Sequence, residues 1–186
     1  MSEPDSPLKG PGKKGVTLIA VASIVIRYWA IFGGLLITAL VLMTTASVVS
    51  GFIFSKPFPG DFELVELGVA VAAFTFLPFC QLTGSNVTVD IFTAWASDRL
   101  IDGFKVIASL ISGAFATLLI TTMYGGMTYY RQYNEVTPIL ELPIWSVFPP
   151  ILFSLALLVL ASLITLVEAV KGLARPASPR PTSPRL

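Results

Sequence analysis

Hydrophobic residues along this chain gather into four long runs that carry almost no charge. They are Tyr28–Ser55, a run from Leu67 onward, Val106–Tyr130 and Leu142–Val167. A helix needs about 20 apolar residues to cross a bilayer, and each run reaches that length once its first turn is included. Apolar and polar residues do not alternate at a two-residue period, so a membrane β-barrel is not predicted. We expect an all-α integral membrane protein with spans at about 28–54, 62–82, 105–130 and 143–170.

Two further segments have the pattern of helices that lie along the membrane surface. Residues 16–27 are apolar and end at Arg27, which predicts a short interfacial helix before the first span. Between the second and third spans, polar residues recur at steps of three and four from Val89 to Lys105. This predicts an amphipathic helix in the interface, with Asp90 on its polar face and Trp95 at headgroup level.

The two ends of the chain differ sharply from the apolar part between them. Residues 1–15 and 174–186 are rich in proline and basic residues, which is typical of disordered tails. We therefore expect one four-helix membrane domain at 16–173 between two tails.

Basic residues predict the orientation of the spans. Of the 12 Lys and Arg residues, all but Lys56 and Arg131 lie before the first span, between the second span and Lys105, or after the fourth span. Short loops rich in Lys and Arg stay in the cytoplasm. We therefore expect both termini to be cytoplasmic.

Composition limits the chemistry that the chain can perform. Hydrophobic residues make up 54% and charged residues 12%, against roughly 25% charged in a soluble domain. Histidine is absent and Cys80 is the single cysteine, so imidazole-ligated haem and an internal disulfide are excluded. No cluster of nucleophile, base and metal ligands occurs. We expect a protein that is not an enzyme and binds no cofactor, metal or nucleic acid.

Acidic residues mark the start of the second span. Asp61 follows the turn Pro59-Gly60 and can cap the helix, and Glu63 and Glu66 come within its first two turns. Their spacing of three predicts that the two glutamates share one face. Two readings stay open: the carboxylates complement the helix dipole, or one of them pairs with a basic group of a partner subunit.

The connection before the fourth span is aromatic and rich in proline. Trp145 and several tyrosines predict an outer aromatic belt, and Glu135 is an acidic candidate for a subunit contact. Pro143, Pro149 and Pro150 predict a kink or a broken first turn in this span.

Several short strings follow one another in a characteristic order. The strings are Gly60–Leu67, Leu77–Leu82, Asn86–Phe92, Glu135–Leu140 and Leu142–Trp145. Together they resemble a known family, the small membrane subunits (DctQ type) of tripartite ATP-independent periplasmic (TRAP) transporters. The resemblance covers about residues 27–172 and implies a bacterial inner-membrane protein. One departure is Gly84-Ser85-Asn86, because many members have a glycine and a histidine at that place.

The resemblance implies a scaffold for a larger permease subunit that carries the substrate and sodium sites. It also implies a periplasmic substrate-binding protein as a partner, which delivers an organic acid. Two alternatives remain from the residues alone: a small homo-oligomeric channel or exporter, and a haem-free membrane anchor of a redox complex.

Overall fold

A computed structural model describes residues 13–83 and 98–173. These residues form long helices joined by short connections, and the described ranges contain no strand, only an isolated bridge between Val136 and Pro143. The elements are α1 (Lys13–Phe54), α2 (Asp61–Thr83), α4 (Asp98–Tyr133), the 3₁₀ helix η1 (Ile144–Val147) and α5 (Phe148–Leu173). Four of the helices are long and apolar enough to cross a membrane, as the hydrophobic runs predict.

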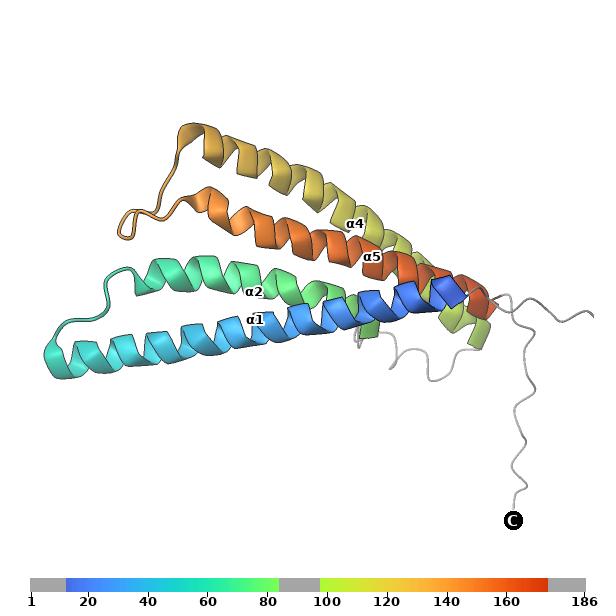
Figure 1. The fold of residues 1–186 in the computed structure, drawn as a ribbon, viewed down its shortest axis with the longest axis horizontal. Coiled ribbons are helices and arrows are strands. Elements are labelled where there is room, and N and C mark those ends of the chain that lie inside the picture. Colours follow the sequence, from blue (N-terminus) through green and yellow to red (C-terminus); the bar gives the residue numbers. More distant parts are fainter. Residues whose placement is uncertain (1–12, 84–97, 174–186) are drawn as a thin grey trace, which may run out of the picture.

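The helices pack side by side, with α2 and α5 between the outer helices α1 and α4 (Figure 1). The connections 55–60 and 134–143 lie together at one end, which we call the loop end. The first residues of α1 and the last residues of α5 lie at the opposite end. α1 and α4 therefore form the two edges of the assembly.

The segment 16–27 does not form the separate surface helix that we expected. It continues without a break into the first span, and α1 begins at Lys13, inside the stretch expected to be a tail. The physical reason is that no proline occurs in α1 and no glycine lies between Gly15 and Gly33. At about 1.5 Å per residue, a helix of 42 residues extends about 63 Å.

The second expected surface helix is described only in its last part. Residues 98–105 belong to α4 and run directly into the third span, while 89–97 lie outside the described residues. Asp90 and Trp95 therefore lie outside the described residues, and so do both expected tails apart from residues 13–15.

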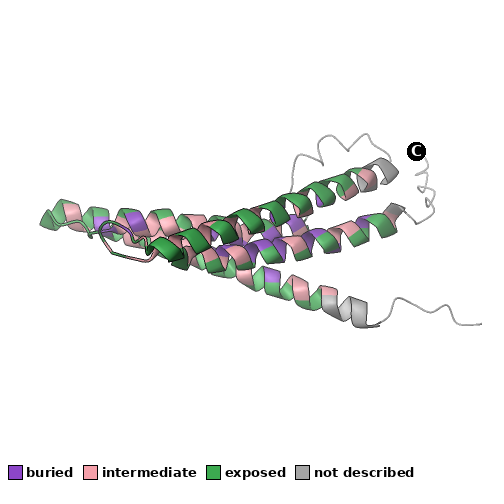
Figure 2. Ribbon diagram, turned by 90° about the horizontal axis from the view of Figure 1, so that it is seen from above, coloured by how far each residue is buried: buried purple, intermediate pink, exposed green. Residues whose placement is uncertain are grey.

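Exposed residues cover the outside of the helices (Figure 2). Many of them are large and apolar, where a soluble protein would carry charge. In the most apolar stretch of α5, 44% of residues are buried, against 11% in α1 and in α4. α5 is therefore the centre of the packing, and the two edge helices turn most of their surface outward. Leu155 and Ala161 of α5 are fully buried, in two separate clusters.

Small and hydroxyl side chains hold the helices together. Hydrocarbon provides no hydrophobic driving force between helices, so association depends on close packing and polar contacts. Thr165 of α5 accepts a hydrogen bond from the Gln81 amide of α2 at 3.2 Å and lies 3.0 Å from the Ser109 hydroxyl of α4. Nearer the loop end, the Trp29 indole of α1 donates to the Ser154 hydroxyl of α5 at 2.8 Å. These contacts join all four helices.

The fourth span begins with the broken first turn that its prolines predict. Pro143 precedes the 3₁₀ turn η1, and the α-helix begins only at Phe148. Pro149 and Pro150 then occupy the first turn of α5, where a helix does not need the missing N–H groups.

α1 and α2 approach each other closely at Gly33. A Cβ atom on Gly33 would overlap the hydroxyl of Thr75, which is fully buried, while a Cβ on Gly34 would meet nothing. We expect Gly33→Ala to lower the free energy of unfolding by about 1–3 kcal/mol relative to Gly34→Ala, because the overlap forces the helices apart. Thermal unfolding of the two purified variants in detergent measures the difference. Equal stability would show that Thr75 moves aside without cost.

Candidate functional site

Glu63, in the first turn of α2, binds the connection between α4 and α5. One carboxylate oxygen accepts the Ile139 N–H at 2.7 Å and the other accepts the Leu140 N–H at 3.0 Å. The side chain is only 7% exposed. Hydrogen bonds to an ionised carboxylate are stronger than neutral ones, and a buried N–H left without a partner is costly. We call this pair of hydrogen bonds the Glu63 clamp.

Hydrogen bonds within the connection 134–143 also stabilise its conformation. The Thr137 N–H donates to the Leu142 carbonyl at 2.9 Å, and the Leu142 N–H donates to the Thr137 hydroxyl at 3.1 Å. Asn134 and Glu141 have positive φ angles of 49° and 52°, which let the chain reverse twice within a few residues. Together with the Glu63 clamp, these bonds fix the shape of the connection.

A glycine allows α2 to begin directly under this connection. Gly60 has φ of 80°, and a Cβ atom there would overlap the side chain of Leu140. A residue with a side chain is therefore excluded on two grounds, by conformation and by space. The turn brings Glu63 within reach of the Ile139 and Leu140 N–H groups.

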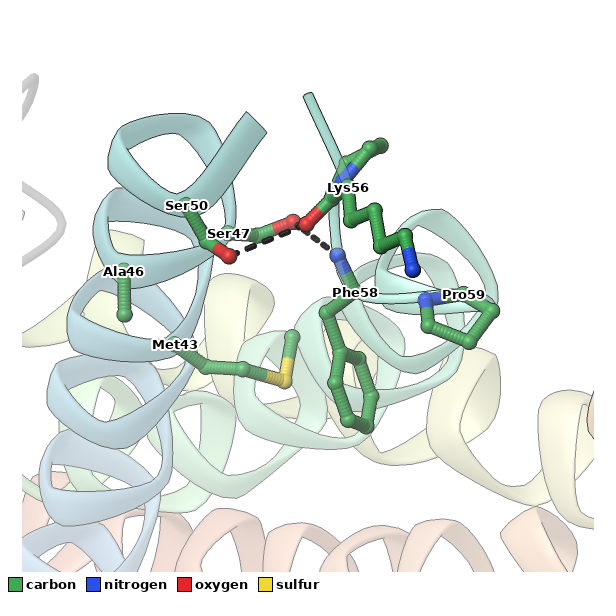
Figure 3. A pocket seen from close by; sticks show the side chains of 8 residues that line it. Met43, Ala46, Ser47, Ser50, Lys56, Phe58 and Pro59 are labelled. Carbon is green, nitrogen blue, oxygen red and sulfur yellow. Dashed lines mark hydrogen bonds between the residues drawn. The ribbon is translucent and has the colours of Figure 1, made fainter. Parts of the chain in front are cut away.

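The other connection of the loop end is held by the end of α1. The buried Ser47 hydroxyl donates to the Asp61 carboxylate at 2.6 Å and accepts the Phe58 N–H at 3.1 Å. The Ser50 hydroxyl donates to the Lys56 carbonyl at 2.9 Å (Figure 3). Asp61 also accepts the N–H of its neighbour Phe62, at 2.7 Å. Asp61 thus anchors the turn between α1 and α2.

The two glutamates of α2 do not share one face as their spacing predicted. Glu63 is buried under the connection 134–143, whereas Glu66 is exposed. Three helical residues turn through about 300°, so the two side chains point about 60° apart. This angle is enough to place one inside the protein and the other outside it. Glu66 belongs to an outward stripe of α2, which we define by Phe62, Glu66, Val69, Ala73 and Leu77.

Aromatic side chains gather where α4 ends. Tyr129 stacks at a tilt on Tyr133 with ring centroids 4.6 Å apart, and the guanidinium carbon of Arg131 lies 5.8 Å from the centroid of the Trp145 ring. Trp145 is 36% exposed, and Glu135 is half-buried. Aromatic rings of this kind favour the boundary between hydrocarbon and headgroups.

The clamp could not be seen in the sequence because its partners are backbone groups. Glu63 was a candidate residue, but Ile139 and Leu140 lie more than 70 positions away and supply only their N–H groups. Ser47 looked like any other hydroxyl of a membrane helix. Its position fourteen residues before Asp61 gives no local signal.

The geometry at the loop end serves binding and positioning. Within the described ranges, no three His, Cys, Asp or Glu side chains gather in a way that could hold a metal ion. The acidic groups at this end either hold backbone N–H groups or face outward. Four apolar helices with short, tied connections define a multi-pass membrane protein.

Comparison with protein families gives this class a name. The model of the tripartite ATP-independent periplasmic transporters, DctQ component, matches residues 40–172. The match covers well over half of the chain, which therefore belongs to this family, as the ordered strings had indicated. The family is one of transporter components, in agreement with the expectation of a protein that is not an enzyme. No curated protein and no solved structure matched the chain.

The Glu63 clamp makes a prediction for the mobility of the connection. Glu63→Ala removes the acceptor of two N–H groups, so we expect the amides of Ile139 and Leu140 to exchange hydrogen roughly tenfold faster or more. Hydrogen exchange followed by mass spectrometry on peptides from 134–143 measures this. Glu141→Gln is the matched control, because its side chain is exposed at the same end. Unchanged exchange in Glu63→Ala would mean that the connection is held without the carboxylate.

Proposed function

We propose that this chain is the small, Q-type permease subunit of a TRAP transporter, and that it scaffolds the large permease subunit. The family match over residues 40–172 carries the proposal. The transporter takes up an organic acid, driven by sodium, after a periplasmic substrate-binding protein has delivered it. The small subunit contributes a rigid membrane support to this process.

The distribution of charge in the spans agrees with a role as a scaffold. Coupled transporters keep ionisable groups or broken helices near the middle of the membrane to hold ions and substrate. In this chain, no charged side chain lies near the middle of any apolar run. Among the described residues, the hydroxyls of the spans bond mostly to a carbonyl three or four residues earlier, as Thr38 does to Gly34 and Thr117 to Gly113. Substrate and sodium therefore bind in the large subunit.

The outward stripe of α2 is the surface that we assign to the large subunit. Phe62 is 74% exposed and Val69 is 48% exposed, and Glu66 lies between them on the same side of the helix. An ionised carboxylate on an apolar stripe is costly near hydrocarbon unless a cation pairs with it. A Lys or Arg of the large subunit supplies that cation.

The tails and the connection between α2 and α4 lie on the cytoplasmic side of the inner membrane in this proposal. The distribution of Lys and Arg supports this orientation. The loop end, with its aromatic residues and the Glu63 clamp, then faces the periplasm. There it meets the outer ends of the large subunit and the incoming binding protein.

Purification of the tagged chain from its native membrane in mild detergent tests the assignment. We expect a large multi-span permease to co-purify in equal amount. Recovery of the chain as a homo-oligomer, or together with redox subunits, would overturn the proposal in favour of a channel or a membrane anchor.

The stripe of α2 predicts which glutamate matters for assembly. Glu66→Ala removes the outward carboxylate, so we expect about tenfold less large subunit to co-purify, in line with the loss of one charge-assisted contact. Glu141→Ala, an exposed glutamate of the same end, is the control and keeps the wild-type yield. Equal yields of the complex from both variants would show that Glu66 does not contact the large subunit.

The orientation predicts the accessibility of the two ends. A protease added to intact spheroplasts should leave a tag on either terminus uncut, because both ends lie in the cytoplasm. The same tags should be cut after the membrane is permeabilised, which serves as the control. Cleavage of either tag in intact spheroplasts would reverse the proposed orientation.

A further inference from the structure

A cavity of about 450 Å³ lies at the loop end, between the last turns of α1 and the connection 55–60 (Figure 3). This volume falls within the range of about 300–1,000 Å³ that is usual for small-molecule sites. Its walls are mostly apolar, and Met43, Ala46 and Phe58 are among the residues that line it. Ala46, Phe58 and Lys56 are exposed, so the cavity opens to the outside of the protein.

The polar side chains that line the cavity are two hydroxyls, which have hydrogen-bond partners within the chain, and one charged side chain. Ser47 and Ser50 donate their hydroxyl hydrogens within the chain, to Asp61 and to the Lys56 carbonyl. Lys56 is the one charged residue among those that line the cavity. Figure 3 shows its side chain running beside Pro59 at the cavity rim. The carboxylate of Asp61 already accepts two hydrogen bonds, from Ser47 and from the Phe62 N–H.

From the ends of two candidate membrane spans, we infer that the cavity lies where hydrocarbon meets the headgroups. The apolar helix α1 ends at Phe54 and the apolar helix α2 begins at Asp61, so the connection between them follows directly on two membrane spans. Phe52 and Phe54 are 90% and 71% exposed, which keeps the approach to this region apolar. A lysine at this depth extends its ammonium toward the headgroups while its stem lies along apolar surface.

We propose that this cavity binds an anionic phospholipid of the leaflet at the loop end. Part of an acyl chain fills the apolar cavity beside Met43, Ala46 and Phe58. The lipid phosphate accepts a charge-assisted hydrogen bond from the Lys56 ammonium. An amphipathic ligand of this kind matches an apolar cavity with a single cation at its rim, at the depth of lipid headgroups.

A carboxylate of another protein subunit could also meet Lys56, but it fits the cavity less well. It would leave the apolar interior without an occupant, whereas a lipid supplies the charge and the chain together. The proposal is independent of the large subunit and can be tested on this chain alone.

The test is lipid binding by the full-length chain, purified in detergent and stripped of lipid. Native mass spectrometry records bound molecules during titration with phosphatidylglycerol, with zwitterionic phosphatidylethanolamine, and with inorganic phosphate. We expect one tightly bound phosphatidylglycerol and neither of the others at the same concentrations. Lys56→Met should weaken this binding by about tenfold or more, because the charge-assisted hydrogen bond is lost. Lys171→Met, an exposed lysine on the last turns of α5, should leave it unchanged.

A second pair of variants tests the cavity separately from the charge. Ala46→Phe should abolish binding by filling the cavity, while Val48→Phe, at an exposed position that does not line it, should not. Equal thermal unfolding temperatures show that both variants fold. Three results would overturn the proposal: equal binding of both lipids, binding of free phosphate in place of lipid, or full lipid binding by Lys56→Met and Ala46→Phe. Loss of the large subunit from Lys56→Met, without any change in lipid binding, would assign the lysine to a protein contact instead.

Discussion

Helices in a bilayer gain nothing from burying apolar surface against one another, because the surrounding lipid is equally apolar. Everything else in this structure depends on that constraint. The contacts between helices use small residues and hydroxyls, such as Gly33 against Thr75 and Ser162 against Ser112 at 3.2 Å. Many leucine and phenylalanine side chains, such as those of Leu35, Phe52 and Leu118, are left outside. An assembly held in this way keeps large apolar surfaces free for other membrane components.

The two connections at the loop end follow the complementary constraint, that buried backbone groups need partners. Here side-chain oxygens supply them: Glu63 binds two N–H groups of the connection 134–143, and Ser47 binds one in the connection 55–60. These hydrogen bonds therefore fix the conformation of the two connections at the loop end. The scaffold role that we propose requires such a fixed shape.

The hydrophobic pattern was sufficient to predict the four helices, because length and apolarity alone determine what can span a bilayer. The prolines were sufficient to predict that the first turn of the fourth span is broken, since a proline acts on the backbone locally. The pattern failed at residues 16–27, where it predicted a separate surface helix. A surface helix distinct from the span would need a residue that interrupts the helix between them, and the sequence contains none there. The pattern also failed for Glu63, because its partners are N–H groups with no identity in the sequence. Its place in the first turn made Glu63 a candidate for helix-dipole or subunit contact, but it did not indicate the contact that Glu63 makes.

The unequal lengths of α1 and α2 have a consequence for the membrane itself. The uncharged part of α1, from Tyr28 to Phe54, extends about 40 Å, whereas α2 offers only about 25 Å from Leu67 to Thr83. A hydrocarbon layer of about 30 Å matches neither. Because the two helices pack together, a tilt that fits α1 into the layer tilts its shorter neighbour as well. Hydrophobic mismatch thus gives the subunit a preferred tilt in the membrane. A change in bilayer thickness changes that tilt, and with it the orientation of any protein that packs against the subunit.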